Sequence, residues 1–239
     1  MTTQSVTYSL QENVATICID DGKRNALAPE VLKGIRDALD RAEKDEAIVI
    51  ITGREDVFSA GFDLKVMKRG GSNAIGMLRA GYSLTARVLS YPYPVIAACN
   101  GHSLAMGVFL MLSADYVIGS RGDYKIAANE VAIGMTMPRV AAATLRNRLR
   151  PSHFQTAVTL AKYFDVEGAH EAGFFDELVE TNELEARARA LAEQCKQLDM
   201  ASHKISKRRI RAAVIRRIRW SLPLDLLDAA LIGLRKSRR

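Results

Sequence analysis

The chain has 239 residues, of which 48% are hydrophobic and 26% charged, and its formal net charge is +7. These values fit one globular domain, or one domain with a small appendage, that can bury a substantial core. Three widely spaced cysteines exclude a disulfide framework, no signal-peptide pattern opens the chain, and the longest apolar run is too short to cross a membrane, so we expect a cytoplasmic chain without membrane insertion.

The first part of the chain predicts strands that alternate with helices. Residues 5–20 alternate apolar and polar side chains about a turn, which predicts a β-hairpin, and residues 28–45 have the apolar spacing of a helix. Short apolar runs predict strands buried on both faces at 47–52 and 93–99. We also expect helices over 75–91 and 103–112 and a strand over 113–120.

The second part of the chain predicts mostly helices. They are expected over residues 137–149, 152–161, 166–172, 184–198, 202–220 and 223–234, and 176–180 is a strand candidate among them. Alternating strands and helices followed by helices indicate an α/β fold. We expect its core to span residues 1–198 and a basic helical segment to span residues 199–239.

The charge is concentrated in that C-terminal segment. Residues 200–239 contain twelve Lys and Arg but only two acidic residues. This composition is typical of a solvated helix face, and it also suits a phosphate-bearing ligand, a nucleic acid or an acidic partner. Because Val214, Ile215 and Ile218 indicate a face that packs on something, nucleic-acid binding ranks last and we expect none.

Two loops that follow expected strands consist of small residues. In "VFSAGFDL", Ser59, Ala60 and Gly61 allow a ligand close to the backbone, and Asp63 is placed to cap a short helix. "CNGHSLAMG" likewise follows a buried strand and leads into a helix N-terminus. The first amides of a helix lack internal partners and suit an anion. Two such loops from adjacent strands can therefore form an oxyanion hole.

These loops, with "KRNAL" at 23–27 and "NEVAIGMTMP" at 129–138, resemble the crotonase, or enoyl-CoA hydratase/isomerase, superfamily. The resemblance covers roughly residues 6–179. It implies an α/β fold that is a crotonase-like spiral of ββα units, with C-terminal helices used for trimerisation. It also implies an acyl-CoA thioester as substrate, no metal and no further cofactor. The implied assembly is a homotrimer or a dimer of trimers.

The same resemblance implies where the substrate is held. The backbone N–H groups of Phe62 and Met106 are expected to bind the thioester oxygen; the family has three glycines where this chain has Ala105, Met106 and Gly107. The implied substrate-binding residues are Lys23, Arg24, Ala26, Ala60, Asp63, Lys65, Phe109 and Met135. Further cations that can meet the CoA phosphates are Lys68 and Arg69, which lie close in sequence, and Lys204 or Lys207 from a neighbouring subunit.

The carboxylates decide which reaction of the family we expect. Hydration of an enoyl thioester needs two proton-handling groups, and the hydratases of this family carry two glutamates. One matches Glu130, whereas Phe109 stands in place of the other. Phe109 would exclude water from the side of the pocket opposite the glutamate. A single glutamate in such a pocket resembles the enoyl-CoA isomerases, in which one carboxylate moves a proton between C4 and C2. We therefore expect an isomerase that works through an oxyanion-stabilised enolate, with Glu130 as its catalytic residue.

Two alternatives stay open at this point. A hydratase, or another lyase reaction of the family, needs a second carboxylate from elsewhere in the chain, such as Glu171, Asp176 or Glu177. A non-catalytic acyl-CoA-binding protein is the alternative from another class, and it is favoured by the lost glycines and by Phe109.

Overall fold

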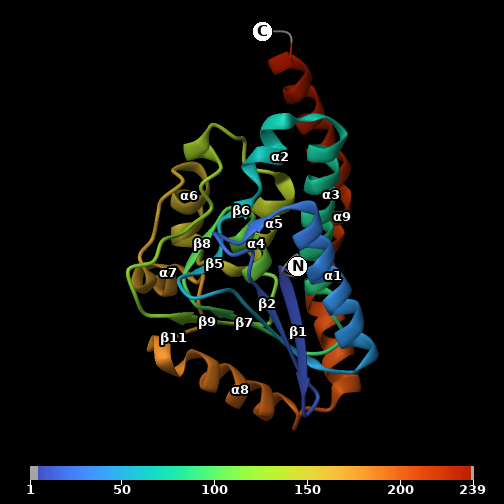
Figure 1. The fold of residues 1–239 in the computed structure, drawn as a ribbon, viewed down its shortest axis with the longest axis vertical. Coiled ribbons are helices and arrows are strands. Elements are labelled where there is room, and N and C mark those ends of the chain that lie inside the picture. The colour runs from blue at the N-terminus through green and yellow to red at the C-terminus, as the bar shows by residue number, and fades with distance from the viewer. Residues whose placement is uncertain (1–4, 238–239) are drawn as a thin grey trace.

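The computed structural model describes residues 5–237, with the side chains of residues 5–232, and is built around a six-stranded sheet (Figure 1). Residues 1–4 and 238–239, which include the start of the N-terminal segment and the last two basic residues, lie outside the described residues. The strand order is β1-β2-β4-β7-β9-β11. The strands are β1 Val6–Gln11, β2 Val14–Ile19, β4 Ile48–Thr52, β7 Val95–Cys99, β9 Tyr116–Ser120 and β11 Glu177–Val179.

Strand pairing follows the predicted pattern of a hairpin and buried parallel strands. β1 and β2 pair antiparallel, and all other neighbours in the large sheet pair parallel. Two small sheets accompany it: one has the order β10-β8-β5, and the other pairs β3 with β6. Their strands are β3 Ala26–Leu27, β5 Val57–Ser59, β6 Gly61–Phe62, β8 His102–Leu104 and β10 Ile126–Ala127.

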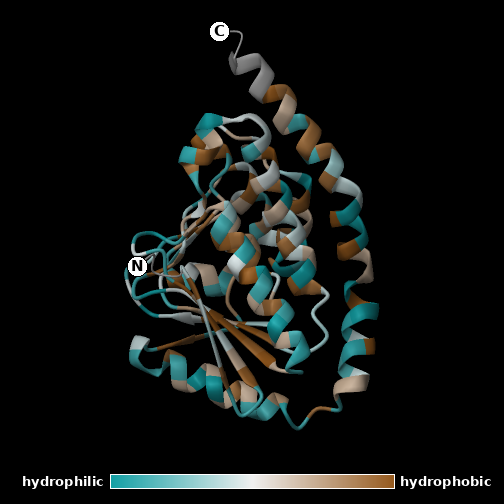
Figure 2. Cartoon of the chain, turned by 45° about the vertical axis from the view of Figure 1, so that its right-hand side comes forward, coloured by the Kyte–Doolittle hydropathy of each residue, from teal (hydrophilic) through white to brown (hydrophobic). Residues whose placement is uncertain are grey.

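Helices cover both faces of the large sheet (Figure 1). α8 lies on one face, where its Leu184, Ala188 and Ala192 pack on strand residues such as Ile50 and Ile96. The other helices contribute to the larger core on the opposite side, and the strands between the two layers are strongly hydrophobic (Figure 2). The helices are α1 Pro29–Lys44, α2 Leu64–Arg69, α3 Gly71–Leu89, α4 Met106–Met111, α5 Arg139–Arg148, α6 Pro151–Thr159, α7 Val166–Ala172, α8 Leu184–Cys195 and α9 Met200–Ser237, with 3-10 turns η1 Val131–Ile133 and η2 Thr181–Glu183.

Three of the expected helices are wrong in their bounds. Ser103 and Leu104 belong to strand β8 and not to a helix, because β8 is inserted between β5 and β10. The helices expected over 202–220 and 223–234 form the single helix α9, which continues through Pro223. A proline inside a helix costs about 3 kcal/mol. Packing on both sides of it, by Ile218 and Leu226, offsets that cost.

α9 packs along the preceding part of the chain and shares its core. It lies against α3 and α5, and Val214, Ile215 and Ile218 are buried in the main core, as their spacing predicts. The expected division at Leu198 falls in the turn between α8 and α9. Within residues 5–237, no helix combines the length and the apolar character needed to cross a bilayer.

Candidate active site

The two small-residue loops meet at the ends of neighbouring strands. β5 and β8 are adjacent and parallel, with Val57 opposite His102, so the turns that follow them leave the sheet at the same edge. A Cβ placed on Gly61 would lie 2.9 Å from the Ala105 Cβ and 3.2 Å from the backbone nitrogen of Met106. The φ of Gly61 is +87°, which also favours glycine. The close approach of the two loops therefore depends on a glycine at this position.

The second loop ends in an unusual helix start. Met106 is the first residue of α4, so its N–H has no partner inside the helix, and no other acceptor is found for it within the described part of the chain. Ala105, which precedes it, has φ 48° and ψ −124°. This conformation belongs almost entirely to glycine. The structure thus keeps the backbone geometry of a glycine turn although the residue is alanine.

Glu130 is buried just before the exposed turn η1. It is 5% exposed, and its Oε2 has no hydrogen-bond partner among the described residues. Burial raises the pKa of its carboxyl to about 7, and a hydrogen bond from its own backbone N–H opposes part of this shift. Such a pKa is suited to proton transfer near neutral pH, because the group can both take up and release a proton.

Helix α3 contributes two residues that the sequence did not single out. The Tyr82 ring meets the Phe62 ring edge-on, with 5.7 Å between the centroids, and burial, with a smaller contribution from the charge of Glu130, raises the pKa of the Tyr82 hydroxyl. A Cβ on Gly81 would lie 2.4 Å from the Phe62 ring and 3.4 Å from the Met106 sulfur. The one available signal was a glycine in the middle of a predicted helix, which often has a packing reason.

The "KRNAL" loop is attached directly to the first small-residue loop. The side-chain amide of Asn25 donates to the carbonyls of Val57 and Phe58, and the Ala60 N–H donates to the Arg24 carbonyl at 3.0 Å. Ala26 is the register partner of Gly61 in the β3–β6 pair. The predicted substrate-binding residues of these two segments are therefore neighbours in space.

The other predicted substrate-binding residues are Asp63, Lys65, Phe109 and Met135. Asp63 caps α2 by accepting from the N–H groups of Lys65 and Val66, as its position predicts, and the Lys65 side chain is exposed. Phe109 is 1% exposed on α4. The Met135 N–H donates to the Glu130 carbonyl at 2.8 Å, which closes the turn over η1.

Lys207 cannot serve as a phosphate-binding cation in this structure. It is 4% exposed, and its Nζ donates to Asp115 at 2.5 Å and to the Tyr93 carbonyl at 3.0 Å. Burial lowers the pKa of Lys207 to about 8 against the opposing effect of Asp115. Its expected role was wrong because its partner stands 92 residues away in the sequence, where no local pattern reveals it.

Two of the carboxylates considered for a second acid or base are already engaged. Asp176 accepts from Arg148 at 2.6 Å and from the Val117 N–H at 2.8 Å. Glu177 is paired with Arg187. Glu171 is exposed on α7.

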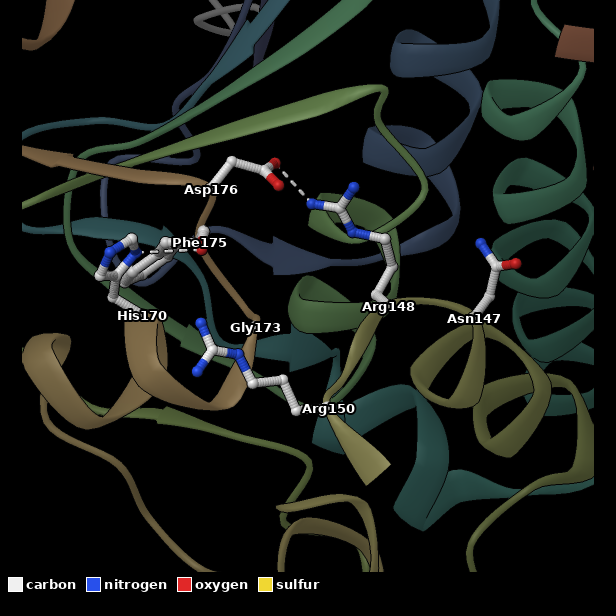
Figure 3. A pocket seen from close by; sticks show the side chains of 7 residues that line it. All are labelled: Asn147, Arg148, Arg150, His170, Gly173, Phe175 and Asp176. Atoms are coloured by element: carbon white, nitrogen blue, oxygen red, sulfur yellow. Dashed lines mark hydrogen bonds and ion pairs between the residues drawn. The ribbon is translucent and has the colours of Figure 1, made fainter. Parts of the chain in front are cut away.

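The surface also has a hollow of about 340 Å³, and Glu130 is not among the residues that line it (Figure 3). It lies where α5, α7 and the start of α6 meet, and it is lined by Asn147, Arg148, Arg150, His170, Gly173, Phe175 and Asp176. Arg148 points at Asp176 and donates to its carboxylate, and a ring nitrogen of His170 forms a hydrogen bond with the Phe175 carbonyl. Two polar side chains of the hollow are therefore already bound to other residues of the chain.

Comparison with known proteins gives consistent similarities. The sequence pattern of the enoyl-CoA hydratase/isomerase family matches residues 9–222. A crystal structure of an enoyl-CoA hydratase/isomerase family protein from Pseudomonas syringae is 44% identical with a TM-score of 0.92, over 93% of this chain and 97% of that one. An enoyl-CoA isomerase structure from Mycobacterium tuberculosis is 41% identical with a TM-score of 0.89, over 93% and 97% of the two chains. A probable enoyl-CoA hydratase of Mycobacterium avium is 29% identical over 77% of this chain and 72% of its own length.

Proposed function

The chain belongs to the enoyl-CoA hydratase/isomerase family and has its crotonase fold, and within this family we propose that it is an enoyl-CoA isomerase. The observation that carries the proposal is the buried Glu130 carboxyl, whose pKa is raised to about 7, combined with Phe109 where family hydratases have a second glutamate. Relatives named as hydratases and relatives named as isomerases both resemble this chain, so the side chains decide between the two activities.

In the proposed reaction, Glu130 moves one proton within a 3-enoyl-CoA. The ionised carboxylate removes a proton from C2, whose acidity comes from the adjacent thioester carbonyl. The electron pair of that C–H bond delocalises as a dienolate with its negative charge on the thioester oxygen. Protonated Glu130 then returns the proton to C4, which leaves the double bond between C2 and C3 and restores the carboxylate.

The backbone N–H groups of Phe62 and Met106 are proposed to hold the thioester oxygen during this step. Support comes from the contact between their two loops and from the Met106 N–H at the start of α4, where helix amides carry partial positive charge. Donors fixed in a low-dielectric site stabilise the developing enolate, and one such donor typically contributes about 2.7–4 kcal/mol to the lowering of the barrier.

The CoA end of the substrate is proposed to lie along the "KRNAL" loop. Lys23 and Arg24 are exposed there. Lys65 is exposed on α2, which directly follows the first small-residue loop in the sequence. The Arg24–Ala60 hydrogen bond supports this placement, because it fixes the loop against residues of the proposed oxyanion hole. Cations at this position can bind phosphate oxygens through charge-assisted hydrogen bonds.

We also propose a homotrimer, or a dimer of trimers, as the assembled form. Large apolar side chains stay exposed along α9, namely Ile210 and Trp220, at 77% and 78%, with Leu224, Leu227 and Leu231 further along. Exposed apolar surface of this kind marks protein–protein contacts. Native mass spectrometry of the 26.3 kDa chain tests this proposal, and a monomer at micromolar concentration contradicts it.

The experiment that tests the reaction uses purified protein with 3-enoyl-CoA and, separately, with 2-enoyl-CoA. An isomerase converts the first into the conjugated 2-enoyl thioester and forms no 3-hydroxyacyl-CoA from the second. The Glu130→Gln variant is expected to lose about 10²–10⁴-fold in turnover. Formation of the 3-hydroxy product identifies a hydratase, whereas binding of the thioester without any turnover identifies a non-catalytic binder.

A further inference from the structure

The surface hollow where α5, α6 and α7 meet has walls that the fold holds in place. Gly173 has a φ of +94°, and a Cβ there would lie 3.0 Å from the Arg148 carbonyl oxygen and 3.4 Å from the Arg150 backbone nitrogen. The Arg150 N–H donates to the Ala172 carbonyl at 3.0 Å. The end of α7 is therefore fixed against the turn that joins α5 to α6, and this close approach depends on a glycine.

Two basic side chains of the hollow are oriented by contacts that leave part of their hydrogen-bonding capacity unused. Arg148 donates to Asp176 at 2.6 Å through a terminal nitrogen, and its Nε has no partner within residues 5–232. One ring nitrogen of His170 forms a hydrogen bond with the Phe175 carbonyl at 3.1 Å, which leaves the second ring nitrogen for another group. Both side chains line the hollow in fixed orientations (Figure 3).

Arg150 supplies a charge that the fold does not compensate. Its side chain is exposed, and no described residue forms an ion pair or a hydrogen bond with its guanidinium. Figure 3 shows this guanidinium extended toward the side of the hollow where His170 stands. Because Arg148 and Asp176 compensate each other, Arg150 leaves the lining with a net positive charge. The lining therefore favours an anion.

Capping of the helix ends does not account for these side chains. Cations near the C-terminus of a helix often donate to its last carbonyls. At the end of α7, however, backbone groups already do so: the Gly173 N–H donates to the Ala169 and His170 carbonyls, and the Arg150 N–H donates to the Ala172 carbonyl. The Arg150 guanidinium thus remains available to a ligand.

We propose that this hollow binds a phosphate monoester, with the Arg150 guanidinium as the main donor and with Arg148 and His170 beside it. Its volume of about 340 Å³ lies at the lower end of the range of small-molecule sites, which is about 300–1,000 Å³. The hollow therefore suits a phosphate group that carries a small organic part. A phosphate fits better than a carboxylate, because its terminal oxygens accept from several donors at once and the positive lining compensates its second charge. This site goes beyond the proposed isomerase reaction, which gives these residues no role.

The test is equilibrium dialysis of the full chain against ³²P-labelled inorganic phosphate at constant ionic strength. The wild type is expected to bind phosphate saturably, with a Kd on the order of 1 mM. Arg150→Gln is expected to weaken binding at least about tenfold, because it removes a charge-assisted donor. The folded structure should persist in this variant, since the contacts of Arg150 with the fold come from its backbone.

A second variant changes the charge of the hollow from another wall. Asn147 is exposed at the end of α5, and Asn147→Asp adds a carboxylate there without a change of shape, so it is also expected to weaken phosphate binding. Arg36→Gln, on the exposed face of α1, is the matched control for net charge. Arg24→Gln is the control for phosphate bound at the proposed CoA site.

The outcomes separate this inference from the proposed function. Weaker phosphate binding in Arg150→Gln and Asn147→Asp, with unchanged binding in Arg36→Gln and Arg24→Gln, supports the site even if the protein isomerises no enoyl-CoA. The proposal is overturned if the wild type binds no phosphate saturably, if either hollow variant binds it as the wild type does, or if a control loses as much affinity as Arg150→Gln. Displacement of the phosphate by an equal concentration of acetate overturns the choice of a phosphate ligand.

Discussion

Gly61 and Met106 approach each other so closely that a Cβ on Gly61 would lie 3.2 Å from the Met106 backbone nitrogen. The methyl group of Ala105 stands at the same junction, 2.9 Å from that Cβ position. Ala105 also has a backbone conformation, φ 48° and ψ −124°, that normally requires glycine. The turn that presents the Met106 N–H is therefore strained, and the strain comes from a single methyl group.

Replacing Ala105 with glycine is expected to stabilise the protein by about 1 kcal/mol. Relief of the strained conformation is worth about 1–3 kcal/mol, and the greater freedom of glycine in the unfolded chain subtracts about 0.5–1 kcal/mol. Urea denaturation followed by circular dichroism measures the difference. The control is Ala86→Gly inside α3, which should destabilise by about 1 kcal/mol. A loss of stability in Ala105→Gly would show that the alanine is unstrained.

The sequence predicted the parts of the site that depend on local pattern. Strand, small-residue turn and helix occur twice in the chain, and adjacent strands bring such turns to one edge, so the contact between Gly61 and Met106 could be anticipated. The contact of Gly81 and Tyr82 with Phe62 could not, because it joins elements about 20 residues apart whose packing angle no periodicity encodes.

In the C-terminal segment, local sequence likewise fails to predict which basic residue is buried and whether the helix continues through a proline. Its basic residues look alike in sequence, yet Lys207 is buried against Asp115 while Lys204 is exposed. The helix also continues through Pro223, where local propensity predicts a break. The deciding contacts of Lys207 are Asp115 and the Tyr93 carbonyl, and those of the helix around Pro223 come from α3 and α5; a local pattern contains neither set.

Gly81→Ala is expected to damage both stability and turnover. Alanine normally stabilises a helix interior by about 1 kcal/mol relative to glycine. Here the new Cβ would lie 2.4 Å from the Phe62 ring, so the ring and its backbone N–H must move. We expect a net loss of about 1–3 kcal/mol of stability and at least about tenfold in kcat.

Gly76→Ala is the matched control for this change. It lies on the same helix, and its added Cβ meets nothing within 4 Å. Thermal denaturation and steady-state kinetics should show a gain in stability and unchanged kcat for Gly76→Ala. Wild-type kinetics in Gly81→Ala would show that Phe62 does not need its present position.

Lys207→Met is expected to lower the free energy of unfolding by about 3 kcal/mol without weakening the binding of CoA. The substitution removes one of the two cations that pair with the Asp115 carboxylate and leaves Arg211, at 3.0 Å, as the other. The loss of one member of a buried ion pair is strongly destabilising, because the remaining charge stays buried without its partner. Lys204→Met, on the exposed side of α9, should change stability by less than about 0.5 kcal/mol. Weaker CoA binding by folded Lys207→Met, measured by calorimetry, would restore the phosphate-binding role that burial argues against.

Glu130→Gln is expected to stabilise the protein at pH 8 while it removes activity. The folded-state pKa of Glu130 is about 7, above its ordinary value of 4.5, so the folded state holds the proton more tightly than the unfolded state does. Stability from this group is therefore complete below pH 4.5 and is lost as the pH rises toward 7. Above pH 7 the wild type keeps a buried charge whose cost is on the order of 3 kcal/mol.

Glutamine carries no charge, so the variant avoids that cost, and the gain should appear only at high pH. We expect Glu130→Gln to exceed the wild type by about 2 kcal/mol in urea denaturation at pH 8 and to match it within about 0.5 kcal/mol at pH 4. Glu171→Gln on the exposed face of α7 should show no such pH dependence. Equal stabilities of Glu130→Gln and wild type at both pH values would mean that the carboxyl is solvated, and a solvated carboxyl at this position could not be the buried base on which the isomerase proposal depends. A gain at pH 8 accompanied by lost turnover would instead mean that the protein gives up stability to keep its base ionised in an apolar site.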